Sequence, residues 1–311
     1  MSDVTVIILT FNEEMHIGRA LASVAPFASQ VIVVDSMSTD GTAEIARSRG
    51  AKVLFHAFEN QAKQFQWALE NGGAATEWIM RLDADEVIEP DLCAEILEKL
   101  PSLPESVTGV NLKRKHIFMG AWIRYGGRYP LLMMRLFRSG KARIEDRWMD
   151  EHIAVTEGVT VTFDGCFADH NLNNVNYFID KHNKYATREA VEVLNHRYGL
   201  FTRESSITLR GSSYQAFFKR LLKERLYNRV SYPLSSLCYF VWRYFVQLGF
   251  LDGRSGLVYH FLQGYWYRFL VGAKVEELDA AIAGLDDPDE IRSELARLTG
   301  LRLDVDRAGA S

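Results

Sequence analysis

Short apolar segments alternate with helix-forming segments along the first hundred residues, and this alternation limits the possible folds more than any other feature. The apolar segments are residues 4–9, 31–34, 51–55 and 77–82. Apolar runs of this kind are typical of parallel strands covered on both faces. Asn12 is placed to cap the first of the intervening helices, and Gly50 to end the second. The pattern predicts an α/β fold with a mostly parallel central sheet flanked by helices.

Polar residues follow three of these apolar segments at the point where each strand should end. They are Thr10-Phe11-Asn12, Asp35-Ser36 and Asp83-Ala84-Asp85. Ligands of open α/β sheets bind outside the carboxyl ends of the strands, so these groups should share one pocket. Neither a P-loop nor a G-x-G-x-x-G sequence follows the first strand. The pattern therefore favours nucleotide binding but argues against P-loop hydrolysis and dinucleotide redox chemistry.

The Asp83-Ala84-Asp85 segment has two interpretations when it is taken alone. Two aspartates this close can act together on one divalent cation and its phosphate ligand, because hard cations favour oxygen donors. Acids at this position could equally cap the helix that Glu89-Pro90-Asp91 begins. Both interpretations stay open at this point.

Cysteine content and the start of the chain both favour a reducing compartment. The three cysteines, Cys93, Cys166 and Cys238, are odd in number and far apart, which argues against a disulfide framework or a clustered zinc site. The first residues lack the basic segment and apolar core of a secretory signal peptide. We therefore expect the active region to face the cytoplasm.

Charge is distributed unevenly along the chain. Residues 1–100 contain 7 Lys/Arg and 16 Asp/Glu, a balance of −9, whereas residues 201–275 contain 11 and 3, a balance of +8. Basic residues among aromatic ones suit either nucleic acid or anionic lipid headgroups. Residues 214–230 have the pattern of a basic amphipathic helix. Residues 234–251 approach the roughly 17 to 25 residues of a bilayer span, but Arg243 and Gln247 interrupt them.

From this pattern we predict a peripheral membrane surface over residues 214–275, with no nucleic-acid partner and no true crossing of the bilayer. The competing interpretation is that the apolar face packs on the catalytic domain or on a second copy of the chain, since exposed apolar patches often mark protein interfaces. The chain could then be a homo-oligomer.

Three segments together resemble the successive signatures of family 2 glycosyltransferases. They are VTVIILTFNEE at 4–14, VIVVDSMSTDGT at 31–42 and DAD at 83–85. The resemblance is strong over about the first hundred residues and weakens beyond them. It implies a GT-A fold, a nucleotide-sugar donor, a divalent metal (Mg²⁺ or Mn²⁺) and transfer with inversion at the anomeric carbon. The chain looks most similar to bacterial enzymes that extend lipopolysaccharide core or other cell-envelope glycans.

The resemblance also implies residue roles. Donor-binding positions are implied at Thr10, Phe11, Asn12, Glu14, Asp35 and Asp83. Metal-binding positions are implied at Asp85, Asp83 and His170, with Asp85 as the direct ligand. Two of these have plainer alternatives, because Glu14 could act only on its helix dipole and a lone histidine is often structural.

An inverting transfer needs a base that takes the proton from the acceptor hydroxyl, and a carboxylate is a common choice. Glu151 is the preferred candidate and Asp150 the second. The ring of Trp148 and the guanidinium of Arg128 are candidates for binding the acceptor. The alternative is that residues 148–152 form an ordinary charged turn between strands.

The predicted organisation is a GT-A catalytic domain over residues 1–200 and a helical region over 201–311. Residues 1–100 would bind the nucleotide sugar, and residues 101–200 the acceptor. The predicted function is metal-dependent transfer of a sugar, most simply from a UDP-sugar, to a lipid-linked or lipopolysaccharide-type glycan at the cytoplasmic face of the inner membrane. A sugar-phosphate nucleotidyltransferase, or a non-catalytic nucleotide-sugar-binding scaffold, is the alternative.

Overall fold

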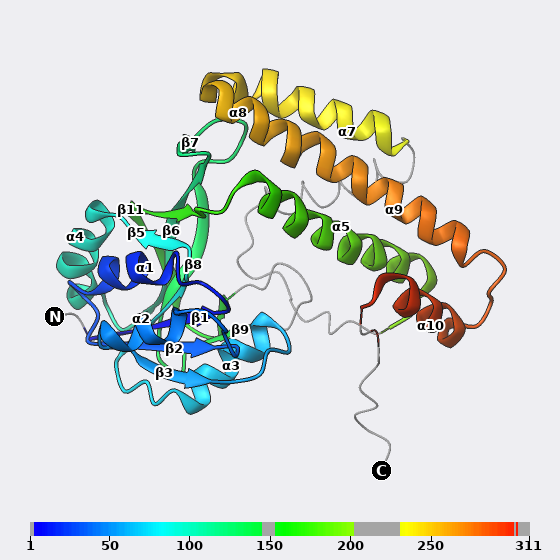
Figure 1. The fold of residues 1–311 in the computed structure, drawn as a ribbon. Helices are drawn as coiled ribbons and strands as arrows, with labels where there is room; N and C mark the ends of the chain where they lie inside the picture. Colours follow the sequence, from blue (N-terminus) through cyan, green and yellow to red (C-terminus); the bar gives the residue numbers. More distant parts are fainter. Residues whose placement is uncertain (1–2, 145–152, 202–230, 302, 304–311) are drawn as a thin grey trace, which may run out of the picture. The chain divides into compact units, whose positions relative to one another are not determined.

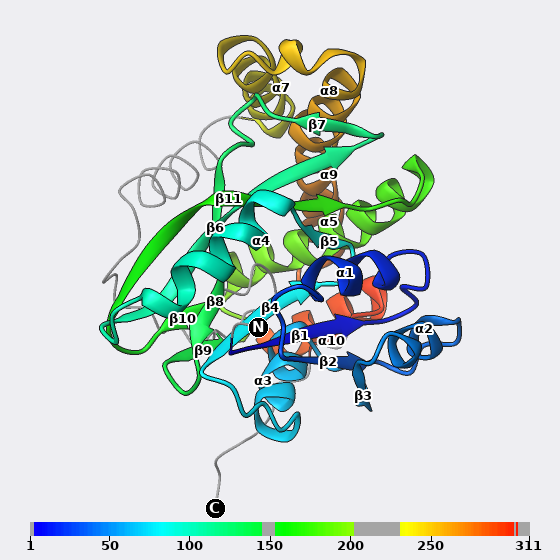
Figure 2. The same ribbon diagram turned by 90° about the vertical axis from the view of Figure 1, so that its left-hand side faces the viewer.

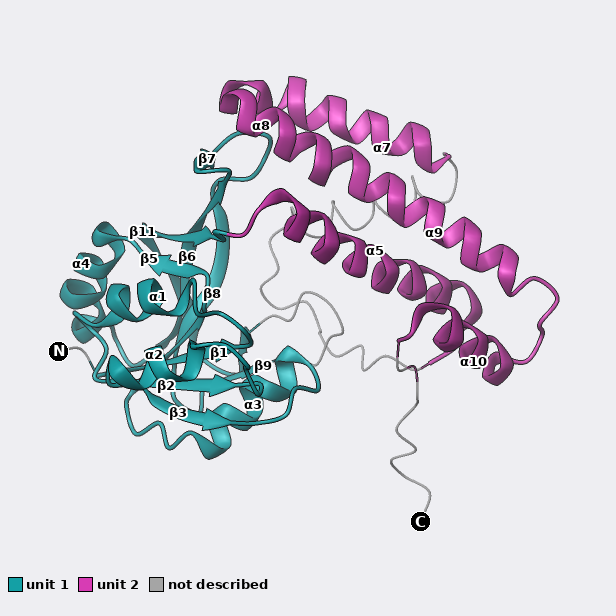
Figure 3. Ribbon diagram, viewed as in Figure 1, with its two compact units in different colours: residues 1–172 teal, residues 173–311 magenta. Residues whose placement is uncertain are grey.

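The computed structural model describes residues 3–144, 153–201, 231–301 and 303. The chain forms two compact units, residues 1–172 and 173–311, which Figure 3 colours separately. Helix α5 (Val175–Tyr198) belongs to the second unit, whereas the sequence prediction placed its residues in the catalytic domain. Trp148, Asp150 and Glu151 lie outside the described residues, as does the predicted basic helix at 214–230.

The first unit is built on a nine-stranded sheet (Figures 1 and 2). Its strands are β1 (Val4–Thr10), β2 (Gln30–Asp35), β3 (Lys52–Phe55), β4 (Trp78–Asp83), β5 (Glu86–Ile88), β6 (Val107–Phe118), β7 (Ala121–Ile123), β8 (Leu131–Arg138) and β11 (Val159–His170). The strand order is β3-β2-β1-β4-β8-β6-β11-β5, with β7 paired to β6. Strands β3, β2, β1 and β4 run parallel, β11 runs parallel to β6, and β8, β5 and β7 run antiparallel to their neighbours. The prediction of a mostly parallel sheet is confirmed. A separate two-stranded sheet pairs β9 (Ala142–Ile144) with β10 (Ile153–Val155).

Helices cover both faces of the main sheet, and this explains why its first strands are apolar without interruption. The helices are α1 (Ile17–Val24), α2 (Thr42–Ser48), α3 (Gln61–Asn71) and α4 (Pro90–Lys99), followed by the 3-10 turn η1 (Leu100–Ser102). Val6 and Ile8 of β1 enter one core cluster with Ile17 of α1. Ile7, between them, enters the opposite cluster with Phe65 of α3. Successive residues of one strand thus fill two cores.

One expected helix start is wrong. Helix α1 begins at Ile17, and Asn12 does not cap it. Asn12 adopts a left-handed backbone conformation with φ 55°, which asparagine tolerates better than most residues, in the loop before the helix. Its side chain bonds across to the loop after β2 instead.

The second unit is helical. After α5 come α7 (Tyr232–Val241), the π-helical turn η2 (Trp242–Val246), the 3-10 turn η3 (Gly249–Asp252), α8 (Gly253–Tyr259), the π-helical turn η4 (His260–Trp266), α9 (Tyr267–Ala281) and α10 (Pro288–Thr299). Asp287 caps α10 and Gly300 ends it. Within the part of the chain that the structure describes, no helix is both long and apolar enough to cross a bilayer.

Candidate functional site

The parallel register brings the ends of three strands together. Thr10 at the end of β1 pairs with Asp35 at the end of β2, and Leu9 pairs with Asp83 at the end of β4. The polar segments that follow these strands in the sequence are therefore neighbours at one edge of the sheet, as predicted. This edge is where ligands of such sheets bind.

Two loops at this edge, residues 11–16 after β1 and 36–42 after β2, are bonded to one another. The Asn12 side-chain oxygen accepts a hydrogen bond from the Thr39 N–H (2.9 Å), and the Asn12 N–H donates to the Ser38 hydroxyl (2.8 Å). One turn further on, the Glu14 carboxylate accepts from the Gly41 N–H (2.9 Å). These bonds join the two loops at the edge of the sheet.

Asp35, at the end of β2, holds the loop that follows this strand. Its carboxylate is fully buried and accepts hydrogen bonds from the Thr10 hydroxyl (2.9 Å), the Ser38 hydroxyl (2.6 Å) and the Ser38 N–H (2.7 Å). Thr10 and Asp35 thus contact each other, as expected from their adjacent strands. Phe11, by contrast, is 59% exposed on the first loop, where its ring is open to a planar partner.

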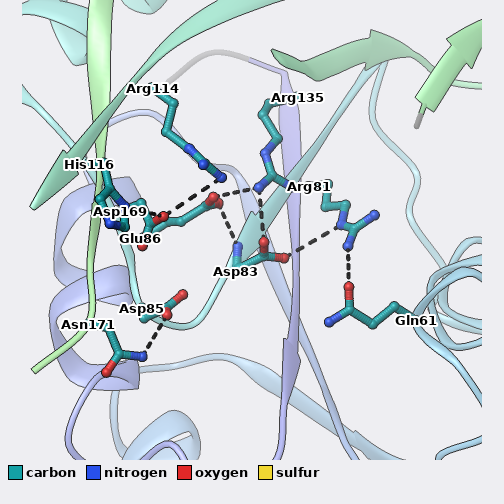
Figure 4. Close-up of polar contacts among 10 residues, drawn as sticks. All are labelled: Gln61, Arg81, Asp83, Asp85, Glu86, Arg114, His116, Arg135, Asp169 and Asn171. Atoms are coloured by element: carbon teal, nitrogen blue, oxygen red, sulfur yellow. Dashed lines mark hydrogen bonds and ion pairs between the residues drawn. The ribbon is translucent and has the colours of Figure 1, made fainter. Parts of the chain in front are cut away.

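Asp83 lies in an ion-pair cluster (Figure 4). Arg135 Nη2 donates to Asp83 Oδ2 (2.9 Å), and Arg81 Nε lies 3.6 Å from Asp83 Oδ1. Burial opposes ionisation of Asp83, but the two arginines outweigh it and lower the pKa of this carboxyl to about 2. Asp83 is therefore ionised at neutral pH, and its charge is already balanced by the protein.

Arg135 also binds Glu86, the first residue of β5. Its Nη2 lies 2.5 Å from Glu86 Oε1, and Glu86 Oε2 accepts from the Asp83 N–H (2.9 Å). One guanidinium thus serves two carboxylates. Burial raises the pKa of Glu86, and since Arg135 only partly offsets this while Asp83 adds to it, the value reaches about 8.

Asp85 has different neighbours from Asp83. Its carboxylate accepts a hydrogen bond from the neutral amide of Asn171 (2.9 Å), and its carbonyl accepts from the His170 N–H (3.0 Å). Neither Asp83 nor Asp85 caps α4, whose N-cap is Glu89. The capping interpretation of this segment is therefore wrong.

His170 ends β11 and is held by Arg19 of α1. Arg19 Nη2 donates to the His170 carbonyl (2.8 Å), and Arg19 Nη1 lies 3.3 Å from His170 Nδ1. Burial lowers the pKa of His170, and the arginine charge lowers it further. A guanidinium can only donate, so Nδ1 accepts here and the ring proton sits on Nε2. Binding of a metal by Nε2 would require that proton to leave.

The donor set fits a metal ion that arrives with a diphosphate better than a preformed metal centre. Among the described residues, no group of three His, Cys, Asp or Glu side chains could hold a metal. Mg²⁺ bound with substrate phosphates commonly uses only one or two protein carboxylates and keeps several waters. Asp83 is paired with two arginines, whereas Asp85 accepts a hydrogen bond from Asn171 and feels the charge of Arg19.

Arg128 is half-buried in the segment before β8, where its N–H donates to the Tyr125 carbonyl (3.3 Å). Nearby in the sequence, the Trp122 ring of β7 has the Lys115 ammonium at 5.1 Å and the Arg124 guanidinium at 5.2 Å from its centroid. An acceptor-binding role for Arg128 stays a prediction.

Sequence reasoning considered Arg135 only as a possible partner of substrate phosphates, and it missed Arg81 and the pairing of both arginines with the acidic residues. Arg81 lies inside β4 and Arg135 inside β8, and each is 4% exposed. A charged residue within an otherwise apolar strand is the signal that could have found them, because buried charges need partners. Arg19, on the amphipathic helix α1, carries no such signal.

Comparison with known proteins identifies the first unit. Residues 5–154 match the model of glycosyl transferase family 2. An uncharacterised glycosyltransferase of Rickettsia typhi is 38% identical over 96 residues, 31% of this chain and 32% of the relative. The chain thus spans about a third of the length of the first relatives that it matches. The lipopolysaccharide core biosynthesis glycosyltransferase LpsC of Rhizobium meliloti is 26% identical over 82% of this chain and 88% of its own.

Among solved structures, glucosyl-3-phosphoglycerate synthase from Mycobacterium tuberculosis, in complex with Mn²⁺, UDP and glucosyl-3-phosphoglycerate, overlaps 37% of this chain and 44% of its own. The identity is 21% and the TM-score 0.31, too low for an argument about the site. The family match is consistent with the sheet order and with the three polar segments at its edge. Residues 5–154, just under half of the chain, are thus similar to glycosyl transferase family 2.

Proposed function

We propose that this protein transfers a sugar from a nucleotide-sugar donor, preferentially a UDP-sugar, to a hydroxyl of a lipid-linked or lipopolysaccharide-type glycan. The observation that carries the proposal is the meeting of Thr10, Asp35 and Asp83 at one sheet edge inside the family-matched segment. Asp85 follows immediately, with a neutral hydrogen-bond partner.

The nucleoside would lie against the two bonded loops. The exposed Phe11 ring offers a stacking surface, and Asp35 and Asn12 hold the loop positions that define the pocket. Preformed loops reduce the entropy that is lost when the donor binds. Asp35 would then act chiefly by positioning backbone groups, since its own oxygens accept three protein hydrogen bonds.

Asp85 would hold a divalent cation, Mg²⁺ or Mn²⁺, with Asp83 and His170 beside it. When bound, such a cation neutralises charge on the departing diphosphate. Asp83, Arg81 and Arg135 would keep the end of β4 rigid, because both guanidinium groups are buried and pair with the partly exposed carboxylate.

The transfer itself would be a single displacement. Glu151 would take the proton of the acceptor hydroxyl, the oxygen would bond to the anomeric carbon, and the bond from that carbon to the nucleoside diphosphate would break. Asp150 is the alternative base, and Trp148 and Arg128 would bind the acceptor. One carboxylate thus ends protonated and the nucleoside diphosphate leaves as the anion.

The acceptor class is supported by the relative with the greatest shared length among those compared, which is named as a lipopolysaccharide core biosynthesis glycosyltransferase. We propose that the protein works at the cytoplasmic face of the inner membrane as a peripheral enzyme of cell-envelope glycan synthesis. The basic and aromatic composition of residues 201–275 is consistent with this location.

The test is release of nucleoside diphosphate from a panel of nucleotide sugars, measured with Mn²⁺, Mg²⁺ or chelator, together with donor binding by calorimetry. Asp85→Asn should lower metal-dependent turnover at least about a hundredfold, in the range seen when one electrostatic stabiliser is lost. Asp164→Asn is the matched control, because this carboxylate is exposed and pairs with Lys113.

Three outcomes separate the candidate functions. Release of nucleoside diphosphate that requires metal and Asp85 supports the transferase. Formation of a nucleotide sugar from nucleoside triphosphate and sugar phosphate would instead indicate a nucleotidyltransferase. Donor binding without turnover, unchanged by Asp85→Asn, would indicate a non-catalytic binding protein.

A further inference from the structure

The turn that connects α7 to α9 in the second unit exposes an unusual number of large apolar side chains. We name residues 232–261 the helical tip; it includes α7, η2, η3, α8 and the start of η4 (Figure 1). Its exposed apolar residues are Leu234, Leu237, Val241, Trp242, Phe245, Val246, Leu248, Phe250, Leu251, Leu257 and Phe261. Each is between 41% and 56% exposed. Such a concentration exceeds the single exposed apolar residues that are normal on soluble proteins.

Two charged side chains and a histidine of the tip lie inside it. Arg243 is 3% exposed and His260 0%. His260 Nε2 lies 3.4 Å from Asp252 Oδ2, and the Asp252 side chain is 2% exposed. A helical hairpin surrounded by water shows the reverse arrangement, with charges outside and apolar side chains within.

Aromatic rings and a glycine enclose these polar groups. The Arg243 guanidinium lies 5.6 Å from the Tyr239 ring centroid and 5.8 Å from that of Tyr259. A Cβ added at Gly249 would come within 2.7 Å of His260 Nε2, so only glycine lets the turn close over the histidine. The tip therefore separates Arg243, Asp252 and His260 from solvent.

The outer surface that remains carries one kind of charge. Residues 232–261 contain three Lys, Arg, Asp or Glu residues, and two of them, Arg243 and Asp252, are the buried ones. The third, Arg254, is exposed. The surface of the tip is thus apolar with a single positive charge, which complements an anionic lipid surface.

We propose that the helical tip inserts shallowly into the interface of an anionic phospholipid bilayer. The exposed side chains come from five consecutive elements around the turn. Trp242, Phe245 and Phe250 suit the depth of the headgroups. Insertion is shallow because no described helix is long and apolar enough to cross.

The test is flotation of the full-length protein with vesicles of phosphatidylcholine, with and without phosphatidylglycerol, in the absence of any donor sugar. The Phe245→Glu/Leu251→Glu double variant should bind vesicles at least about tenfold more weakly, because two large apolar side chains no longer enter the interface. Leu298→Glu is the matched control, since Leu298 is also exposed and apolar but lies on α10. Circular dichroism and size-exclusion chromatography of all three proteins show whether each is folded and in which oligomeric state.

Tighter binding to the phosphatidylglycerol vesicles, lost in the double variant and kept in Leu298→Glu, supports the proposal. If the wild-type protein does not float, or if the folded double variant floats equally well, the tip is not the anchor. A wild-type dimer that becomes monomeric in the double variant, without vesicle binding by either, would show that the tip is an interface between copies. None of these results depends on sugar transfer, so failure here leaves the transferase proposal standing.

Discussion

At the scale of single residues, Arg135 forms ion pairs with two carboxylates of the first unit. Its guanidinium is almost fully buried and is shared by Asp83 and Glu86. Arg135→Met should lower the free energy of unfolding by about 3–5 kcal/mol, because Asp83 and Glu86 both lose the buried guanidinium that they share. Urea denaturation at neutral pH measures the change.

Two companion variants test the reason for that loss. Arg135→Lys keeps the charge but not the planar fork, so its stability should fall between those of wild type and Arg135→Met. Arg135→Met/Glu86→Gln also removes one of the two carboxyl groups that lose Arg135, so it should recover part of the lost stability. Equal stability of Arg135→Met and wild type would mean that the pairing contributes nothing.

Glu86 should give the stability of the first unit a pH dependence of known sign. Its pKa in the folded protein is raised from 4.5 to about 8, so the folded state binds the proton more tightly than the unfolded state. Stability from this group is complete below pH 4.5 and is lost as the pH rises towards 8. The neutral variant Glu86→Gln should therefore gain stability relative to wild type as the pH rises from 5 to 9.

Thermal or urea unfolding at both pH values measures this difference, with the exposed glutamate of α4 as the control in Glu98→Gln. Asp83 does not interfere in this range, because its lowered pKa of about 2 means that its contribution is lost only in stronger acid. A difference between wild type and Glu86→Gln that stays constant from pH 5 to pH 9 would contradict the assignment.

Residue positions at the site were predictable from the sequence where the end of a strand fixes the place of a side chain. Thr10, Asp35 and Asp83 follow apolar runs directly, so parallel pairing had to bring them together. The pairing of Asp83 with Arg135 was not predictable, because the two residues are 52 positions apart and lie on neighbouring antiparallel strands, β4 and β8. Pairing over such a distance depends on topology that no local pattern records.

At the scale of elements, Gly249 sets how tightly the helical tip can close. A Cβ at this position would lie 2.7 Å from His260 Nε2 and 2.9 Å from the Arg243 carbonyl oxygen. Gly249→Ala should therefore destabilise the second unit by about 1–3 kcal/mol, the usual cost of overpacking. Gly264→Ala is the control within the same hairpin, because its nearest neighbour would be the Phe240 Cα at 3.9 Å.

Thermal unfolding followed by far-ultraviolet circular dichroism measures both alanine variants. Equal melting temperatures for Gly249→Ala and Gly264→Ala would show that the turn relaxes without cost. The same glycine would then not explain how the buried polar groups are enclosed.

Elements of the first unit were predictable because their boundaries carry local signals. Pro90 begins α4 and Gly50 follows α2, each where its backbone preference is useful. Asn12 was misread because a capping side chain and a loop-bridging side chain look alike in a sequence. The sequence analysis did not predict the π-helical turns η2 and η4, which contain the buried residues Arg243 and His260.

At the scale of the whole molecule, the chain divides where the sequence gives little warning. Along the chain, the boundary between the units falls between residues 172 and 173, before α5, whereas composition placed it near residue 200. Helix α5 has an alternating polar and apolar surface that would suit either unit. Its partner is α9, nearly eighty residues further on, and the Tyr267 hydroxyl donates to Glu189 across that contact (2.6 Å).

This division predicts that the two proposed tasks can be separated. Residues 1–172 contain both core clusters of the sheet and the whole family-matched segment, so this fragment should fold by itself and show the UDP binding that we propose for the full chain. Residues 173–311 contain the helical tip and their own buried core, so this fragment should bind anionic vesicles but not UDP. Calorimetry with UDP and vesicle flotation, applied to both fragments, measure the separation. Vesicle binding by fragment 1–172, or UDP binding only by the intact chain, would mean that the site needs both units.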